Sequence, residues 1–445
     1  MCLRGAFNEG FSELLEDIDI TDPEFTDWLR MMQMQQDAPP PTEVFAPPQT
    51  SRDQRPMVAL RRIDRADTAR GMFILRAVSQ RVAAGLSAMG NLDITELDAE
   101  ENLVSDDQPT AWVEFECLDD SEMAFVLLRV TGQPNRRIVW SGRLSIEPRL
   151  LVIWHSEDVT RAVNRAVQAV GDAVVSTTAL SPVATIQKAI RRKYEFDRAS
   201  LTKADDLLRS AKDSDMKGLA LAWRGIIRVT ELVEFRKNIA DRLAEAMDFV
   251  DQTAQLAPQS AAVMAMVSEV TLFLSNDVDE VSFFANRAVA LDDQDPEALA
   301  ALGCSLSFEG RHIESHRFAQ VARHYAQGLS YSYDWDLMAG IANIRVGDMA
   351  GGYDMALACH RKMPFGRHAL RYLIVLSILD DRHDDAMQFA GRLRRLEPDF
   401  SVQTLLTKYA PLSSTRDTEL MERLRHKLGS PPLSPPCLTQ RHLPR

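Results

Sequence analysis

Residues 285–303, ANRAVALDDQDPEALAALG, decide the fold of most of this chain. Two stretches of helical spacing, ANRAVAL and ALAALG, flank a polar turn at Asp293. Small side chains stand where two helices would cross closely, and leucines fill the groove between them; the small residues are Ala285, Ala288 and Gly303, and the leucines are Leu299, Leu302 and Leu306. The stretch therefore predicts two packed helices joined by a short turn.

The same turn recurs along the chain at a regular interval. Pro258 in LAPQSAA, Asp293, Pro364 in MPFGRHAL and Pro398 in LEPDF occupy equivalent positions between helices. Pro258 to Asp293 is 35 residues, Pro364 to Pro398 is 34, and the whole interval of 140 is four periods of 35. A period near 34 is typical of tetratricopeptide (TPR) helix pairs. Such pairs bury their apolar faces only against neighbouring pairs, which predicts a curved solenoid with a concave groove.

We place this solenoid at 186–410. Its first unit, at about 186–235, is divergent and contains SLTKADDLLRSA and LALAWRGIIRV. Residues 411–445 begin with a helix, TELMERLRHKL at 418–428, which we expect to cap the array. The proline-rich remainder, GSPPLSPPCLTQRHLPR, has the composition of a disordered tail.

Residues 57–178 predict a small α/β domain, which makes the fold class α+β. MVAL at 57–60 and the stretch 91–97 suit short buried strands. From residue 111 the hydrophobic period changes to two, because Val113, Phe115 and Cys117 alternate with glutamates. Two further strands follow after tight turns, at 123–130 and from residue 138, and we expect an antiparallel meander. In the last strand the residues predicted to share one face are Ile138, Trp140, Gly142 and Leu144.

Two helices complete this domain. One is predicted near 69–89 and the other at about 157–175, each with an unbroken apolar stripe at helical spacing. Ser156 is the predicted N-cap of the second helix, and Glu157 and Asp158 complement its dipole.

The N-terminal 56 residues divide at a proline-rich stretch. Residues 37–56 hold six prolines and predict an extended linker, with a docking peptide for a proline-binding module as the alternative. Before it, Asp22-Pro23 predicts a helix start within 1–36. Phe25, Trp28 and Leu29 then fall on one face of this helix, which we list as a possible partner-binding surface.

Composition limits the classes of protein. Hydrophobic content of 45% and charged content of 26% are ordinary for a soluble globular protein, and no apolar run is long enough to span a bilayer. Five scattered cysteines without a CxxC pair argue against a disulfide framework and a zinc site, so we expect a reducing, cytoplasmic location. The net charge of −13 argues against direct sequence-specific binding of nucleic acid. The cationic segment with Lys188, Arg191 and Arg192 is interpreted as a solvated helix face, with phosphate contact as the alternative.

No catalytic motif supports an enzyme, and we expect no cofactor and no metal. The sequence lacks a GxxxxGK loop, a GxSxG elbow and an HExxH pair. His312 and His316 have metal-ligand spacing but no clear third ligand, and His383 within DDRHDD falls in a turn between repeat helices. Tyr331, Tyr333 and Trp335 precede or open a repeat helix. We interpret these aromatics as packing between repeats and keep them as candidate partner-binding residues.

Two resemblances bear on function. The 57–178 region resembles the TolB-like module of bacterial regulators, through MVAL at 57–60, AAGLSAMGNLDIT at 83–95, IVWSGR at 138–143 and DVTRAVNRAV at 158–167. With LLEDIDITDPEFTDWLR at 14–30 and the TPR-like repeats, the chain resembles bacterial transcriptional activators of the SARP type. In that family a winged-helix DNA-binding domain and a helical bacterial transcriptional activator domain (BTAD) come first. Residues 14–30 match only the end of the BTAD, so no DNA-contacting residue can be carried over.

The resemblance implies a non-catalytic, transcription-regulatory protein that acts through protein contacts. The expected partners are proteins, such as a DNA-binding regulator or the transcription machinery, and the oligomeric state is open. Two alternatives are a truncated or mis-started activator, and a TPR scaffold or accessory subunit of an unrelated complex. Related module combinations are also attached to nucleotide cyclases, but no cyclase domain is found in this sequence.

Overall fold

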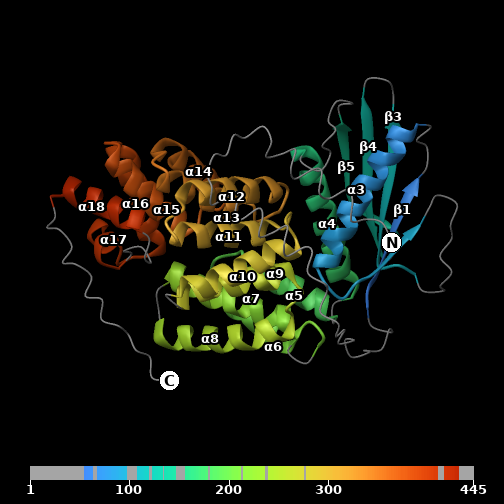
Figure 1. Ribbon diagram of the computed structural model, residues 1–445, viewed down its shortest axis with the longest axis horizontal. Coiled ribbons are helices and arrows are strands. Elements are labelled where there is room, and N and C mark those ends of the chain that lie inside the picture. The colour runs from blue at the N-terminus through green and yellow to red at the C-terminus, as the bar shows by residue number, and fades with distance from the viewer. Residues whose placement is uncertain are drawn as a thin grey trace. The chain divides into compact units, whose positions relative to one another are not determined.

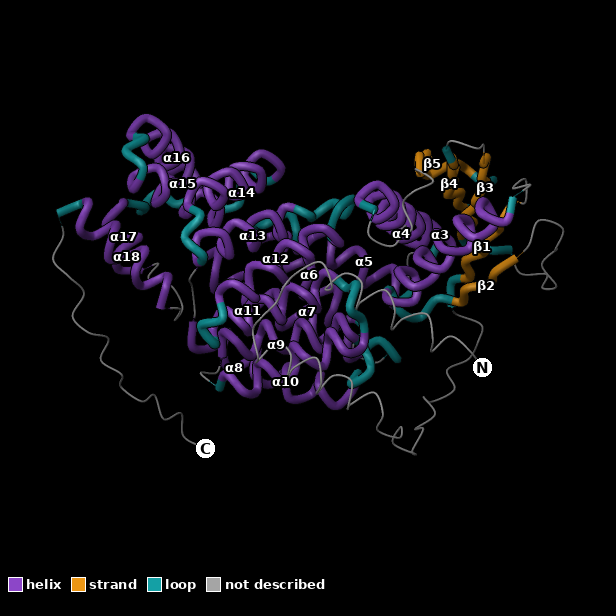
Figure 2. Tube along the Cα trace, turned by 45° about the horizontal axis from the view of Figure 1, so that its top comes forward, coloured by secondary structure: helices purple, strands orange, loops and turns teal. Residues whose placement is uncertain are grey.

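The five-stranded sheet has the order β2-β1-β3-β4-β5 in this computed structural model (Figures 1 and 2). The strands are β1 (Met57–Ile63), β2 (Asp93–Leu97), β3 (Ala111–Asp119), β4 (Ala124–Gly132) and β5 (Arg137–Ile146). The residues that the structure describes are 55–63, 68–97, 108–119, 123–133, 135–146, 156–178, 181–211, 214–235, 239–274, 277–408 and 415–429.

The sheet is mixed: parallel pairing around β1 is combined with the predicted antiparallel meander. β1 runs parallel to β2 and to β3, with Val58 opposite Ile94 and Ala111. β3, β4 and β5 pair antiparallel, which confirms the meander.

One detail of the last strand was predicted wrongly. A register shift between Val130 and Thr131 pairs Val130 with Trp140 but Thr131 with Ile138. The intervening Val139 is therefore an extra residue, which moves Ile138 to the opposite face from Trp140 and Leu144. Accordingly Ile138 is 57% exposed whereas Leu144 is buried.

Helices α3 (Ala69–Ala88) and α4 (Glu157–Thr177) cover one face of the sheet (Figures 1 and 2). The apolar stripe of α4 is buried, as its spacing predicts, and Ser156 is its N-cap, accepting the backbone N–H of Val159 at 3.5 Å. Thr68 caps α3 in the same way, accepting the N–H of Gly71 at 2.9 Å. These capping hydrogen bonds fix the residue at which each helix begins.

The rest of the described chain is a series of antiparallel helix pairs. The first helices of successive pairs begin at residues 217, 261, 296, 333, 367 and 402, so from residue 261 each repeat takes 34 to 37 residues. The pairs are α5 (Pro182–Lys193) with α6 (Arg198–Ser210), α7 (Lys217–Thr230) with α8 (Ile239–Leu256), α9 (Ala261–Leu274) with α10 (Val278–Leu291), α11 (Pro296–Phe308) with α12 (His312–Tyr325), α13 (Tyr333–Arg345) with α14 (Met349–Lys362), and α15 (Arg367–Leu379) with α16 (His383–Leu396).

All four predicted turns fall between the second helix of one pair and the first of the next. Pro258 lies between α8 and α9, Asp293 between α10 and α11, and Pro364 between α14 and α15. Pro398 precedes α17 (Val402–Lys408), and α18 (Thr415–Lys427) follows with Leu420 and Leu424 buried. The TPR-like pattern is thus confirmed at the level of helices and period.

The α7–α8 repeat departs from this period, because 44 residues separate the starts of α7 and α9. Part of the excess is a five-residue π-helix, η3 (Glu231–Phe235), that continues α7. A π-turn widens the backbone and is commonly found where a helix carries a functional or strained site.

The sheet layer packs on the helical array through α4, and the described residues lie in one compact unit. The Asn164 side chain donates to the carbonyls of Tyr325 at 2.8 Å and Gln327 at 2.7 Å. Gly328 follows with φ +88°, and a Cβ added there would stand 2.9 Å from the Cα of Arg161. Only glycine allows both this conformation and this approach to α4.

We therefore expect Gly328→Ala to weaken docking of the sheet layer on the array. The left-handed conformation alone costs about 1 kcal/mol for alanine, and the clash with α4 adds to it. Gly347→Ala is the matched control, because Gly347 has φ +95° and open space around its Cα. Thermal unfolding should give a clearly lower midpoint for G328A than for G347A, and equal midpoints would contradict the role of this contact.

Candidate functional site

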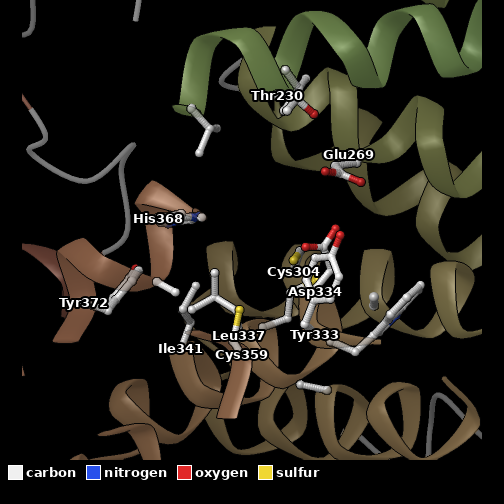
Figure 3. A pocket seen from close by; sticks show the side chains of 18 of the residues that line it. Thr230, Glu269, Cys304, Tyr333, Asp334, Leu337, Ile341, Cys359, His368 and Tyr372 are labelled. Carbon is white, nitrogen blue, oxygen red and sulfur yellow. The ribbon is translucent and has the colours of Figure 1, made fainter. Parts of the chain in front are cut away.

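A cavity of about 350 Å³ lies within the helical array. Its walls come mainly from the first helices of successive pairs, α7, α9, α11, α13 and α15, with additions from α5, η3, α12, α14, α17 and α18. Figure 3 shows Thr230 of α7 and Glu269 of α9 on one side of it, and Leu337 and Ile341 of α13 on the other. The inner face of the repeats therefore forms a hollow that is predominantly apolar.

The three aromatic candidates near the start of α13 contribute to the packing of this wall. Tyr333 and Trp335 are buried and line the cavity. The Tyr333 hydroxyl donates to the carbonyl of Tyr194 at 3.0 Å, and Trp335 Nε1 donates to the carbonyl of Pro296 at 3.1 Å. Tyr331 stacks on Tyr194 with ring centroids 4.1 Å apart. The expected packing between repeats is present, while binding by these residues stays a prediction.

The sequence did not single out the turn that meets these aromatics. Lys193, Tyr194 and Phe196 connect α5 to α6 and line the cavity. Phe196 has φ +54°, a conformation that bulky residues rarely adopt and that costs of order 1–3 kcal/mol. The surrounding packing holds it there, and the aromatic spacing YEF gave only a weak signal of this role.

A second long-range contact joins η3 to the start of α15. The buried carboxylate of Glu234 accepts the backbone N–H groups of Arg367 at 3.0 Å and His368 at 3.2 Å. These N–H groups have no partner within the helix, and the positive end of the helix dipole favours an anion there. Glu234 therefore acts as an N-terminal cap supplied from 133 residues away in sequence.

Arg371 completes the same contact from one turn further along α15. Its guanidinium donates to the carbonyls of Val233 at 2.8 Å and Glu234 at 3.1 Å, and to the carboxylate of Glu397 at 2.5 Å. We call Glu234, Arg367, Arg371 and Glu397 the seam cluster. It fixes the π-helix of the second repeat against the sixth, and both sides of the contact line the cavity.

Charged groups inside the cavity are mostly acidic at one end. Lys193 Nζ lies 3.4 Å from Asp334 Oδ2 and 3.8 Å from the centroid of the Tyr194 ring. Glu269 and Glu297 line the same end, and Figure 3 shows the carboxylates of Glu269 and Asp334 pointing into the open space. Burial raises the pKa of all three carboxyls, although Lys193 lowers it in part. The pKa of Glu297 is raised further by the charge of Glu269.

The cavity cysteines are poor nucleophiles. Burial raises the pKa of the Cys304 thiol to about 12 and that of Cys359 still higher. Since the thiolate is the reactive form, both side chains behave as small apolar wall residues at neutral pH.

The remaining candidates lie elsewhere. Phe25, Trp28 and Leu29, with the segments 1–36 and 37–54, lie outside the described residues. His316 is hydrogen-bonded to Asn343 at 2.8 Å, and His383 is exposed at the start of α16. Arg191 pairs with Asp172, and Arg192 pairs with Glu195 at 2.9 Å. These pairs partly neutralise the cationic helix face.

Within the described part of the chain, no cluster of three metal-ligating side chains occurs. In the same part, no single helix is both long and apolar enough to cross a membrane.

By fold, the chain is a TPR-like array of helix pairs joined to a small mixed sheet with two helices on one face. No family model matches it, and no curated protein matches it.

Solved structures with some similarity include pilF of Pseudomonas aeruginosa, at 13% identity and TM-score 0.32, covering 47% of this chain and 84% of that one. The Cut9–Hcn1 hetero-tetramer structure of the APC/C gives 16% identity and TM-score 0.40, covering 61% and 51%. A STAND protein with a tetratricopeptide repeat sensor from Pyrococcus horikoshii gives 13% identity and TM-score 0.32, covering 62% and 45%.

We expect Glu234→Gln to loosen the seam cluster while leaving the repeats folded. Glutamine removes the charge that offsets the buried Arg371, the partly buried Arg367 and the positive end of α15, and breaking a buried ion pair typically costs about 3–5 kcal/mol. Hydrogen–deuterium exchange of the peptide spanning the first turn of α15 should accelerate.

Glu231→Gln is the control for this change. Glu231 lies in the same π-helix but pairs with Arg228 and Arg242 of its own repeat. If E231Q accelerated exchange in α15 as much as E234Q, the cross-repeat role of Glu234 would be refuted.

Proposed function

We propose that this chain is a peptide-binding helical-repeat protein and that the cavity inside the array is its binding site. The observation that carries the proposal is a largely apolar hollow of about 350 Å³ with a few charged groups at one end. Sites for small ligands and peptide side chains have this character: apolar walls supply affinity and sparse polar groups supply orientation. The size suits a few side chains of an extended segment.

Chemistry at the cavity favours binding over nucleophilic catalysis. Its thiols are protonated, as their raised pKa values indicate. The hydroxyl of Thr230 donates to the carbonyl of Ile226 of its own helix at 2.9 Å, so it is engaged in the backbone of α7. Tyr333 is likewise engaged with the carbonyl of Tyr194.

We further propose that the bound partner is a component of transcriptional control. This step rests on the sequence resemblance to SARP-type activators, with a TolB-like region followed by repeats. In this proposal the array recruits a DNA-binding regulator or part of the transcription machinery. The chain makes no sequence-specific DNA contact of its own.

Blocking the cavity should abolish peptide binding. Ile341→Trp places a large ring in the hollow, whereas Ile313→Trp adds the same ring on α12, where Ile313 is 67% exposed. A random seven-residue peptide phage library selected on the immobilised full chain should enrich families that bind wild type and I313W. These families should lose at least about tenfold in affinity for I341W. No enrichment, or enrichment insensitive to I341W, would refute the cavity as the peptide site.

DNA binding should be weak and non-specific. The net charge is −13, and Arg191 and Arg192 of the cationic helix face are paired to carboxylates, which weakens their attraction for phosphates. Fluorescence anisotropy with a labelled duplex should show any binding at about 50 mM salt vanish by about 200 mM. Retention at the higher salt, with discrimination between duplex sequences, would show that a DNA-reading surface exists.

A further inference from the structure

The acidic end of the cavity carries more negative than positive charge. Three carboxylates, those of Glu269, Glu297 and Asp334, line this end together with one ammonium, that of Lys193. Lys193 pairs with Asp334 at 3.4 Å. Among the described residues, no hydrogen bond or ion pair joins the side chains of Glu269 or Glu297 to a cation. Two half-buried carboxylates therefore face the hollow without a positive partner at bonding distance.

Such an arrangement is costly for the protein alone. A carboxylate withdrawn from water needs a cation or several donors to offset its lost hydration. The raised pKa values of Glu269 and Glu297 express this cost, which is due first to burial. A cation entering the cavity would replace part of the lost hydration.

The chain's own Lys193 shows how this end of the cavity accommodates a cation. Its side chain is only 7% exposed, yet the ammonium is held between a carboxylate and aromatic faces. Nζ lies 3.8 Å from the centroid of Tyr194 and 5.3 Å from that of Phe196. An ammonium over an aromatic ring gains electrostatic attraction, and this gain grows when water is excluded. Further aromatic rings line the same cavity, including those of Trp223, Tyr333 and Trp335.

We propose that the cavity binds a lysine or arginine side chain of a partner peptide, held by Glu269 and Glu297 and flanked by apolar residues. The inference rests on the proposed peptide-binding function and names the chemistry of its partner. Charge complementarity selects the cation, because the two carboxylates face the hollow. The apolar walls select its neighbours, since most of the lining is carbon.

Other charged groups of the cavity are placed elsewhere. Arg371 belongs to the seam cluster, and Arg345 donates to Ser307 at 2.6 Å. Neither is among the groups that most affect the pKa of Glu269 or Glu297. The cationic residues of the cavity therefore leave the acidic end available to an incoming cation.

The peptide selection described above provides the test, with a second readout. Enriched peptides should carry a lysine or arginine next to apolar residues. Synthetic copies with acetylated N-termini should bind full-length protein, as measured by fluorescence anisotropy. Replacing the basic residue with norleucine should weaken binding at least about tenfold, as expected when one partner of a desolvated charge pair is removed.

The protein variants isolate the two carboxylates. Glu269→Gln/Glu297→Gln keeps the size of both side chains and should weaken the basic peptide at least about tenfold, with little effect on the norleucine peptide. The matched control is Asp279→Asn/Glu280→Gln, which removes two charges from the exposed first turn of the outer helix α10 and should leave both affinities unchanged.

Each outcome decides between the two proposals. Selected peptides that are neutral or acidic yet blocked by I341W would overturn the cationic anchor and leave the peptide site standing. No selected peptides with either the full chain or a chain that lacks residues 430–445 would overturn both. Binding that appears only after removal of residues 430–445, which contain Arg441 and Arg445, would assign the cavity to the chain's own tail and overturn the partner proposal.

The pH dependence gives an independent readout. Because burial raises the pKa of Glu269 and Glu297, these carboxyls lose their protons at a higher pH than exposed glutamates do. Affinity for the basic peptide should therefore rise as pH increases from about 5 to about 8. Burial raises the pKa of Asp295, whose charge acts on Glu297, to about 6, and its deprotonation acts in the same direction. The E269Q/E297Q variant retains Asp295, so a pH profile identical to wild type would contradict the assignment. Among the described residues, the charged or titratable groups at or beside this end are Lys193, Tyr194, Glu269, Asp295, Glu297, Cys304, Tyr331, Tyr333 and Asp334.

Discussion

The carboxylate of Glu234 at the N-terminus of α15 is the interaction on which the cavity depends. Helical repeats ordinarily contact only their neighbours, so nothing in repeat packing itself brings the second repeat against the sixth. Here a buried anion satisfies two backbone N–H groups that α15 cannot satisfy internally. In the opposite direction, Arg371 of α15 donates hydrogen bonds to two carbonyls of η3. Polar groups that can pair in only one arrangement thus hold together the two repeats on either side of the cavity.

A polar seam of this kind contributes more to register than to net stability. Burying a charge costs several kcal/mol in lost hydration, roughly what its partners return. Apolar contacts could slide by a turn at small cost, whereas Glu234 meets its donors at one position of α15 only. The turn at Tyr194 adds a second fixed point through its stacking on Tyr331 and its bond from Tyr333. Together these contacts fix the first and second repeats against the fifth and sixth.

The sequence predicted what depends on local pattern. The 35-residue spacing of Pro258, Asp293 and their equivalents located the repeat turns, and alternation around Phe115 located the meander. Ile138 was misplaced because a β-bulge carries no mark in a run of apolar residues. Of the aromatic candidates, Tyr333 and Trp335 line the cavity, whereas no sequence pattern singled out Glu269 or Glu297. Their proximity follows from superhelical curvature, which arises from many small packing angles rather than from any short motif.

The sequence marked the region of the seam only as a divergent unit at about 186–235. This unit contains η3, which continues α7 and contributes to the extra length of the α7–α8 repeat. In a regular α-helix, the Glu234 side chain would pack within its own repeat. In the π-helix, its carboxylate instead reaches the first turn of α15 on the other side of the cavity. In a repeat protein, the residues that depart from the repeat pattern are therefore the first candidates for a contact that regular packing between repeats cannot make.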